Sequence, residues 1–160
     1  MSRFIRALFL GLVTMVCAVP AYAGNDDVEI VEVKAAFEDV KQNVADAIIK
    51  RGYVIDYNAK IGDMLVRTGK DIGSTKKIYN GAETVQFCSA LLTRKMMEAD
   101  PENIAYCPYV IFYYERADRL GTIYVGYREL DDDGSDASET SKKAINKMLD
   151  EIIKEASGTR

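Results

Sequence analysis

The chain has 160 residues, a formal net charge of −4 at pH 7, and neither histidine nor tryptophan. Without an imidazole, Ser-His-Asp and Cys-His catalysis, the usual zinc sites and haem attachment through Cys-x-x-Cys-His are excluded. The acidic balance argues against nucleic acid and anionic membrane surfaces as partners.

The first residues have the pattern of an export signal. Arg3 and Arg6 precede an apolar run over residues 7–19, and residues 21–23 (AYA) form a small-x-small cleavage site. The run is shorter than the roughly 20 residues that a membrane-spanning helix needs. We therefore predict that residues 1–23 are a cleaved signal peptide, and that the protein is periplasmic or secreted with no membrane contact after cleavage. An uncleaved N-terminal anchor is the alternative. The removed segment carries two arginines and no acid, so the net charge becomes −6.

The next residues predict a strand, a helix and a second strand. Apolar and acidic residues alternate over 28–35, which is typical of a half-buried strand. An apolar stripe with three- and four-residue spacing over 37–51 predicts an amphipathic helix, and Gly52 is its expected C-terminal cap. Residues 53–59 then predict the second strand.

The middle of the chain begins with a glycine-rich segment over residues 61–81. A short helix over 63–68 is expected within it, and the rest of the segment is expected to be a loop. Alternation predicts a third strand over 83–90. A short helix over 93–99 follows and ends before Pro101, because the residue that precedes a proline leaves helical space.

The last third of the chain predicts a hairpin and a long helix. Residues 108–115 and 122–129 are rich in β-branched and aromatic side chains, which favours two antiparallel strands. Consecutive aspartates in 131–136 predict a solvated linker, because an EF-hand calcium loop needs alternating ligands. An apolar stripe predicts a helix over about 137–156. We expect one domain over 24–136, with the C-terminal segment 137–160 packed on it as a helix.

Two cysteines remain after cleavage, Cys88 and Cys107. In an oxidising compartment such a pair predicts a structural disulfide, which would stabilise the fold by about 3 kcal/mol in the chain-entropy description. A redox-active or ligand-modifiable pair and two separate reduced thiols are the alternatives. Neither cysteine lies in a Cys-x-x-Cys motif, the usual setting for a thiol of lowered pKa.

Tyrosines and lysines supply the candidate ligand-binding residues. Alternation places Tyr109 and Tyr113 on one face of the hairpin. They either cover a sheet that packs helices on one side, or line an aromatic pocket with hydroxyl donors. Lys70, Lys76 and Lys77 are either solvated charges or contacts for an anion. We take these five residues as the tentative ligand site, and we expect no catalytic residue, metal site or cofactor.

Several local elements occur together between residues 28 and 129. They are the segment Gly62–Gly73, the pair Phe87-Cys88, Met96-Met97 before Asp100-Pro101, and Cys107-Pro108-Tyr109 at the start of a strand. Together with the helix over 37–51, this combination resembles the family called domain of unknown function 302. The resemblance implies an α+β fold in which an antiparallel sheet of about five strands is packed on one face by helices, in split strand-helix-strand units. It implies no activity, because the family's name records none.

Three functional hypotheses remain open from the sequence. The first is an exported, non-enzymatic binding domain whose small-molecule or protein partner occupies the hairpin and the glycine-rich loop. The second is a thiol-redox or sulfur-handling protein that uses Cys88 and Cys107. The third is a structural protein whose sheet edge docks a partner. The identity of the ligand and the oligomeric state do not follow from these patterns.

Overall fold

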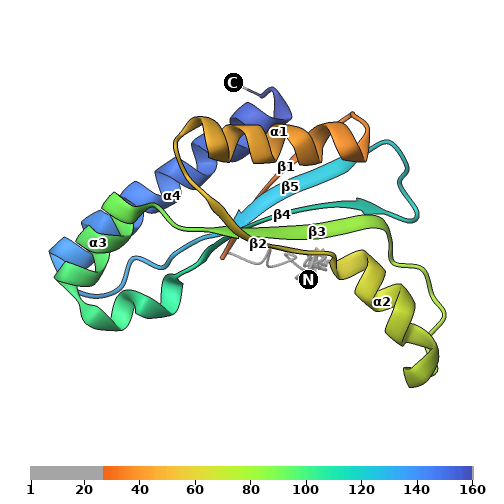
Figure 1. Cartoon of the computed structure of the whole chain (residues 1–160), viewed down its shortest axis with the longest axis horizontal. Coiled ribbons are helices and arrows are strands. Elements are labelled where there is room, and N and C mark those ends of the chain that lie inside the picture. Colours follow the sequence, from red (N-terminus) through yellow and green to blue (C-terminus); the bar gives the residue numbers. More distant parts are fainter. Residues whose placement is uncertain (1–26, 160) are drawn as a thin grey trace, which may run out of the picture.

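Five strands form one antiparallel sheet in the order β1-β5-β4-β3-β2 in the computed structural model, which describes residues 27–159 (Figure 1). The strands are β1 (Val28–Val33), β2 (Ile55–Ala59), β3 (Tyr79–Phe87), β4 (Tyr109–Arg116) and β5 (Ile123–Arg128). The α-helices are α1 (Phe37–Lys50), α2 (Ile61–Gly69), α3 (Ala90–Ala99) and α4 (Asp136–Ser157). Two 3-10 segments complete the fold, η1 (Lys70–Ile72) and η2 (Pro101–Tyr106).

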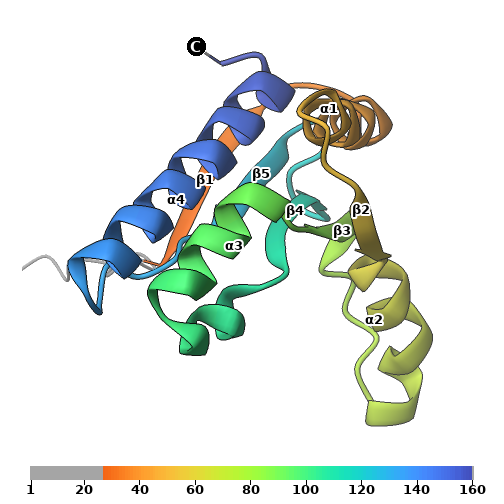
Figure 2. The ribbon, with the colours of Figure 1, turned by 60° about the vertical axis from the view of Figure 1, so that its left-hand side comes forward.

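Helices α1 and α4 cover one face of the sheet, and α3 lies beside α4 on the same side (Figure 1). Helices α1 and α4 contact the strands and each other, and α3 packs against α4 (Figure 2). Helix α2 follows β2, the edge strand at the other end of the sheet from β1. It extends away from the other helices (Figure 2). The second face of the sheet, which we call the open face, is therefore not covered by α1, α3 or α4.

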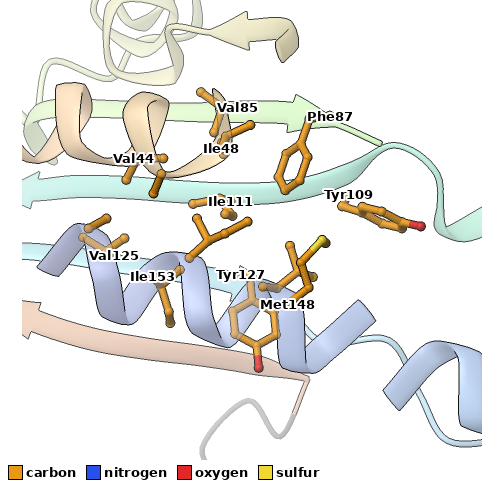
Figure 3. Packing of buried hydrophobic residues seen from close by; sticks show 14 of the residues in the cluster. Val44, Ile48, Val85, Phe87, Tyr109, Ile111, Val125, Tyr127, Met148 and Ile153 are labelled. Atoms are coloured by element: carbon orange, nitrogen blue, oxygen red, sulfur yellow. The ribbon is translucent and has the colours of Figure 1, made fainter. Parts of the chain in front are cut away.

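Strand alternation decides which side chains enter the core. Val85 pairs with Ile111, and Ile111 pairs in turn with Tyr127, so these three side chains share the covered face. Figure 3 shows them together with residues from α1 and α4, such as Ile48 and Ile153. All five are nearly inaccessible to solvent. Burial of this contiguous apolar cluster is the main stabilising contribution in the fold.

The helices present apolar stripes to that core because of their residue spacing. In α1, Val40, Val44 and Ile48 recur every fourth residue and are buried. Helix α4 starts where the Ser135 side chain accepts a hydrogen bond from the Ser138 amide. The stripe predicted in the C-terminal helix is thus part of the same core as the sheet.

The predicted fold class is confirmed: the domain is α+β, with a five-stranded antiparallel sheet and helices on one face. Individual boundaries differ. Strand β3 starts at Tyr79 and ends at Phe87, because Ser89 caps the start of α3. Helix α2 is longer than predicted and continues into η1, and η2 was not predicted.

The predicted signal peptide over residues 1–23 lies outside the described residues. Within residues 27–159, none of the helices combines the length and the apolar character needed to cross a membrane.

Candidate functional site

Two adjoining hollows lie beside the start of β3. The first, which we call the α2 hollow, has a volume of about 580 Å³ and lies between α2 and residues 70–80. The second, which we call the hairpin hollow, has a volume of about 490 Å³ and lies between residues 76–79 and the end of β4. Both volumes fall within the roughly 300–1,000 Å³ that small-molecule sites occupy. The two hollows share part of their lining, namely Lys76, Lys77, Ile78 and Tyr79.

A glycine turn forms the outer wall of the α2 hollow. The Ser74 amide donates a hydrogen bond of 2.8 Å to the Gly69 carbonyl, which brings the chain back toward α2. A Cβ atom at position 69 would stand 2.5 Å from the Ser74 carbonyl oxygen, so this approach requires glycine. Gly73 ends η1 with a φ of +71°. The glycines of this segment thus shape the hollow.

An irregularity in β3 places Tyr79 on the open face. The register shifts between Tyr79 and Gly81, so Tyr79 pairs with Arg116 while Gly81 pairs with Glu115. Such a bulge reverses the face to which the preceding side chain points. The Tyr79 ring consequently meets the Tyr114 ring edge-on, with centroids 5.4 Å apart.

Tyr79 begins a stack of aromatic rings across the open face. The rings of Tyr114 and Tyr124 are nearly parallel, with centroids 4.9 Å apart. The Arg119 guanidinium lies 5.8 Å from the Tyr124 ring centroid and donates a hydrogen bond of 2.6 Å to its hydroxyl. The hairpin hollow therefore has an aromatic wall made by Tyr79 and Tyr114.

The charges around the hollows are mainly cationic, with Asp63 in the α2 hollow and Asp118 in the hairpin hollow as the carboxylates. Lys70 lines the α2 hollow, and Lys76 and Lys77 line both. Among residues 27–159, no carboxylate lies within 4 Å of these three ammonium groups. Arg116, by contrast, is engaged by Asp118 through two hydrogen bonds of 2.9 and 2.7 Å.

The cationic side chains near Asp118 lower the pKa of its carboxyl group. The hydrogen bond from Arg116 is the largest effect that lowers the pKa of Asp118, and the charge of Lys76 adds to it. The charge of Lys76 thus acts in the hairpin hollow, although it is the smallest of these effects on Asp118.

The structure brings together three of the five predicted ligand-site residues. Lys70, Lys76 and Lys77 line the hollows, whereas Tyr109 and Tyr113 lie on the covered face and are each 1% exposed. The expectation that both tyrosines share a surface with the lysines is therefore corrected. Strand alternation turns them toward the helices, and burial of their rings contributes to the core.

Tyr113 belongs to a polar network beneath α1. Its hydroxyl donates a hydrogen bond of 3.0 Å to Glu83, and the Lys41 ammonium donates one of 2.8 Å to the other oxygen of Glu83. Burial acts to raise the pKa of Glu83, but the donors Lys41, Asn58 and Tyr113 outweigh it and lower this pKa. Burial and the charge of Glu83 raise the pKa of Tyr113. This network satisfies a buried carboxylate and does not line either hollow.

Tyr109 has a different partner, close to the disulfide. Its hydroxyl lies 2.7 Å from the Thr93 hydroxyl, and burial raises the pKa of Tyr109. Cys88 and Cys107 form a disulfide that joins the end of β3 to the start of β4. Both cysteines are half-buried. The disulfide lies outside the lining of both hollows.

Sequence reasoning did not identify Tyr79, Tyr114 and the exposed Val66 of α2 as residues that line the hollows. Tyr79 was missed because residues 61–81 were expected to form a loop apart from one short helix, with the third strand starting only at residue 83. The Asn80-Gly81 dipeptide was the available signal, since a glycine within a strand often marks a bulge. Within residues 27–159, no group of three or more Cys, Asp or Glu side chains is arranged to hold a metal ion.

Comparisons with known proteins agree with this architecture. The family model described as "Domain of unknown function DUF302" matches residues 29–156, which include nearly all of α4. The fold is similar to the crystal structure of the uncharacterized conserved protein DUF302 from Bacillus stearothermophilus, with a TM-score of 0.66 and 12% sequence identity. The similarity covers 81% of this chain and 98% of that chain, and at this identity it concerns the fold alone. A comparison with curated proteins gives no match.

Proposed function

Because the chain belongs to the family of domain of unknown function DUF302, whose name assigns no activity, we propose a function from its own geometry. The protein is an exported, non-enzymatic domain that binds a small anionic ligand in the α2 and hairpin hollows. Export rests on the signal-peptide pattern of residues 1–23.

The observation that carries the proposal is the meeting of three lysines at two hollows. In a chain of net negative charge, Lys70, Lys76 and Lys77 lie together without a carboxylate within 4 Å among the described residues. An anion in these hollows would be attracted by the lysines that line them. The apolar and aromatic side chains beside the lysines would add contacts to the apolar part of such a ligand.

A binding function is favoured over catalysis by the chemistry of the lining. The chain has no histidine to act as a general base near neutral pH. The buried carboxylate of Glu83, which has a lowered pKa, faces α1 and not the hollows. Besides Asp63 and Asp118, the hollows offer cations, aromatic rings and backbone groups, which suit recognition of a ligand.

Benzoate and inorganic phosphate are suitable probes for this proposal, and calorimetric titration is the measurement. The triple variant K70A/K76A/K77A should bind them at least tenfold more weakly than the wild type. The matched control is K95A/K147A/K154A, which removes the same charge from exposed positions on α3 and α4 and should retain binding. Equal binding by the two triple variants would place the anion elsewhere. The intact mass of natively exported protein tests the export part of the proposal, because cleavage after residue 23 leaves a chain that starts at Gly24.

A second function, thiol-disulfide exchange, is favoured by the position of Cys88. This residue directly precedes Ser89, the N-cap of α3, where the helix dipole would stabilise a thiolate released on reduction. Equilibration with a glutathione redox buffer, followed by alkylation and mass analysis, measures the reduction potential of the pair. A potential above about −230 mV, in the range of redox enzymes, favours exchange, whereas one below about −300 mV indicates a structural disulfide.

A further inference from the structure

We infer that the ligand of this site is a single-chain anionic amphiphile, whose apolar chain occupies the α2 hollow and whose anionic head lies at Lys76 and Lys77. This inference rests on the proposed function and specifies its ligand class. Binding of such an amphiphile requires a hollow with apolar lining for the chain, a hollow with cationic lining for the head, and a continuous passage between the two.

The apolar requirement is met by side chains that folding leaves exposed. Val66, Ile72 and Ile78 are 68%, 76% and 50% exposed, and all three line the α2 hollow. Helix α2 packs on β3 and half-buries Ile61, Met64 and Leu65, but this packing leaves Val66 exposed. Clustered exposed apolar side chains are typical of a binding surface.

The direction of these side chains favours an enclosed chain. Gly62, Leu65, Val66 and Gly69 line the hollow with the three- and four-residue spacing of a single helix face. This face of α2 turns toward residues 70–80, as the glycine turn at Gly69 requires. Figure 2 shows that α2 stands apart from α1, α3 and α4, so these helices leave the hollow uncovered. A slender chain between α2 and the returning segment would cover these side chains more completely than a flat membrane surface.

The cationic requirement is met next to the apolar hollow. Lys76 and Lys77 line both hollows, so a head group placed between them remains continuous with the chain. Asp118 also lines the hairpin hollow, where its ion pair with Arg116 compensates its negative charge. The rings of Tyr79 and Tyr114 complete that wall with apolar surface and hydroxyl groups.

The test is a titration of the wild-type protein with n-alkyl carboxylates of increasing chain length, all below their micelle concentrations. The affinity should rise about two- to fourfold for each added methylene, as expected for burial of a chain. An n-alkyl trimethylammonium ion of equal length should bind at least tenfold more weakly, because the lysines repel it. The variant V66S/I72S should lose the dependence on chain length yet still bind benzoate, whereas the control L91S/L120S, changed at exposed leucines outside the hollows, should retain both.

The outcomes separate this inference from the proposed function. If benzoate binds and chain length has no effect, the amphiphile is excluded and the anion site stands. If neither probe binds, both proposals fail. If the alkyl ammonium ion binds as well as the carboxylate, the assignment of the head group is overturned. Finally, if the V66S/I72S substitution changes only the association with anionic vesicles or with a second copy of the chain, the apolar side of α2 is a docking surface and the inference is wrong.

Discussion

The hydroxyl of Tyr113 donates a hydrogen bond of 3.0 Å to Glu83 between the sheet and α1. Lys41 of α1 bonds to the same carboxylate at 2.8 Å, so one buried acid links β3, β4 and the first helix. Unlike Glu83, Lys41 is partly exposed to solvent. This asymmetry moderates the cost of removing the acid, because an unpaired Lys41 can be rehydrated.

The first prediction concerns pH and Glu83. The folded state lowers the pKa of Glu83, so its contribution to stability is complete above the ordinary value near 4.5 and is lost as the pH falls below it. Between pH 7 and about pH 3 the wild type should therefore lose more of its free energy of unfolding than E83Q does. Urea unfolding at both pH values measures this difference. The control E98Q changes an exposed pair with Arg94 and should follow the wild type. If the free energy of unfolding fell equally with pH in E83Q and the wild type, the network of Tyr113, Glu83 and Lys41 would not be a source of acid sensitivity.

The second prediction concerns the disulfide. Cys88 and Cys107 are 19 positions apart, and a loop of this length contributes about 3 kcal/mol in the chain-entropy description. C88S and C107S should each lower the free energy of unfolding by about this amount, and the double variant by no more than either. Reduction should lower Tm by about 10 °C. Thermal denaturation with and without reductant measures the effect, and additive losses in the double variant would contradict a bridge.

The third prediction concerns the turn at Gly69. In G69A the new methyl group would meet the Ser74 carbonyl oxygen, so the segment over residues 70–78 must move away from α2. This segment is exposed throughout, and the free energy of unfolding should fall by only about 1 kcal/mol. Binding of n-alkyl carboxylates should be lost. The control G52A introduces strain at a φ of +79° outside both hollows and should retain binding. Unchanged affinity in G69A would show that the turn does not shape the ligand site.

The fourth prediction concerns ionic strength. Lys70, Lys76 and Lys77 are exposed, so mobile ions screen their attraction for an anion. Raising NaCl from about 20 to about 200 mM should weaken benzoate binding by about threefold or more. The residual binding of K70A/K76A/K77A should depend little on salt. A wild-type affinity that does not change with salt would indicate recognition by the tyrosine wall and not by the lysines.

The sequence predicts the antiparallel sheet but not which of its two faces the helices cover. Alternation correctly separates Tyr109, Ile111 and Tyr113 from their neighbours in β4. The intervening positions, which include Phe112 and Tyr114, are equally apolar and aromatic. Composition therefore cannot decide which face receives the helices, and the aromatic residues chosen for the site were the buried ones.

The site itself depends on two tertiary features. The bulge that turns Tyr79 toward Tyr114 lies opposite the end of β4, where the Asn80 side-chain amide donates a hydrogen bond to the Arg116 carbonyl. The lysines, in contrast, were identified from their spacing in a glycine-rich segment, because a cationic loop in an acidic chain is visible without coordinates. Their position beside the apolar side of α2 depends on how the chain turns back at Gly69.

The pairing of β1 with β5 has a consequence for the order of folding. Val31 pairs with Val125, so the first strand meets its partner only when most of the chain has been synthesised. Strands β3, β4 and β5 pair with their neighbours in sequence, and these shorter loop closures are entropically cheaper. The central meander should therefore assemble first, with β5 as its temporary edge. Until β1 docks, that edge presents unpaired backbone groups to other chains, which makes the nascent domain most prone to aggregation at this stage.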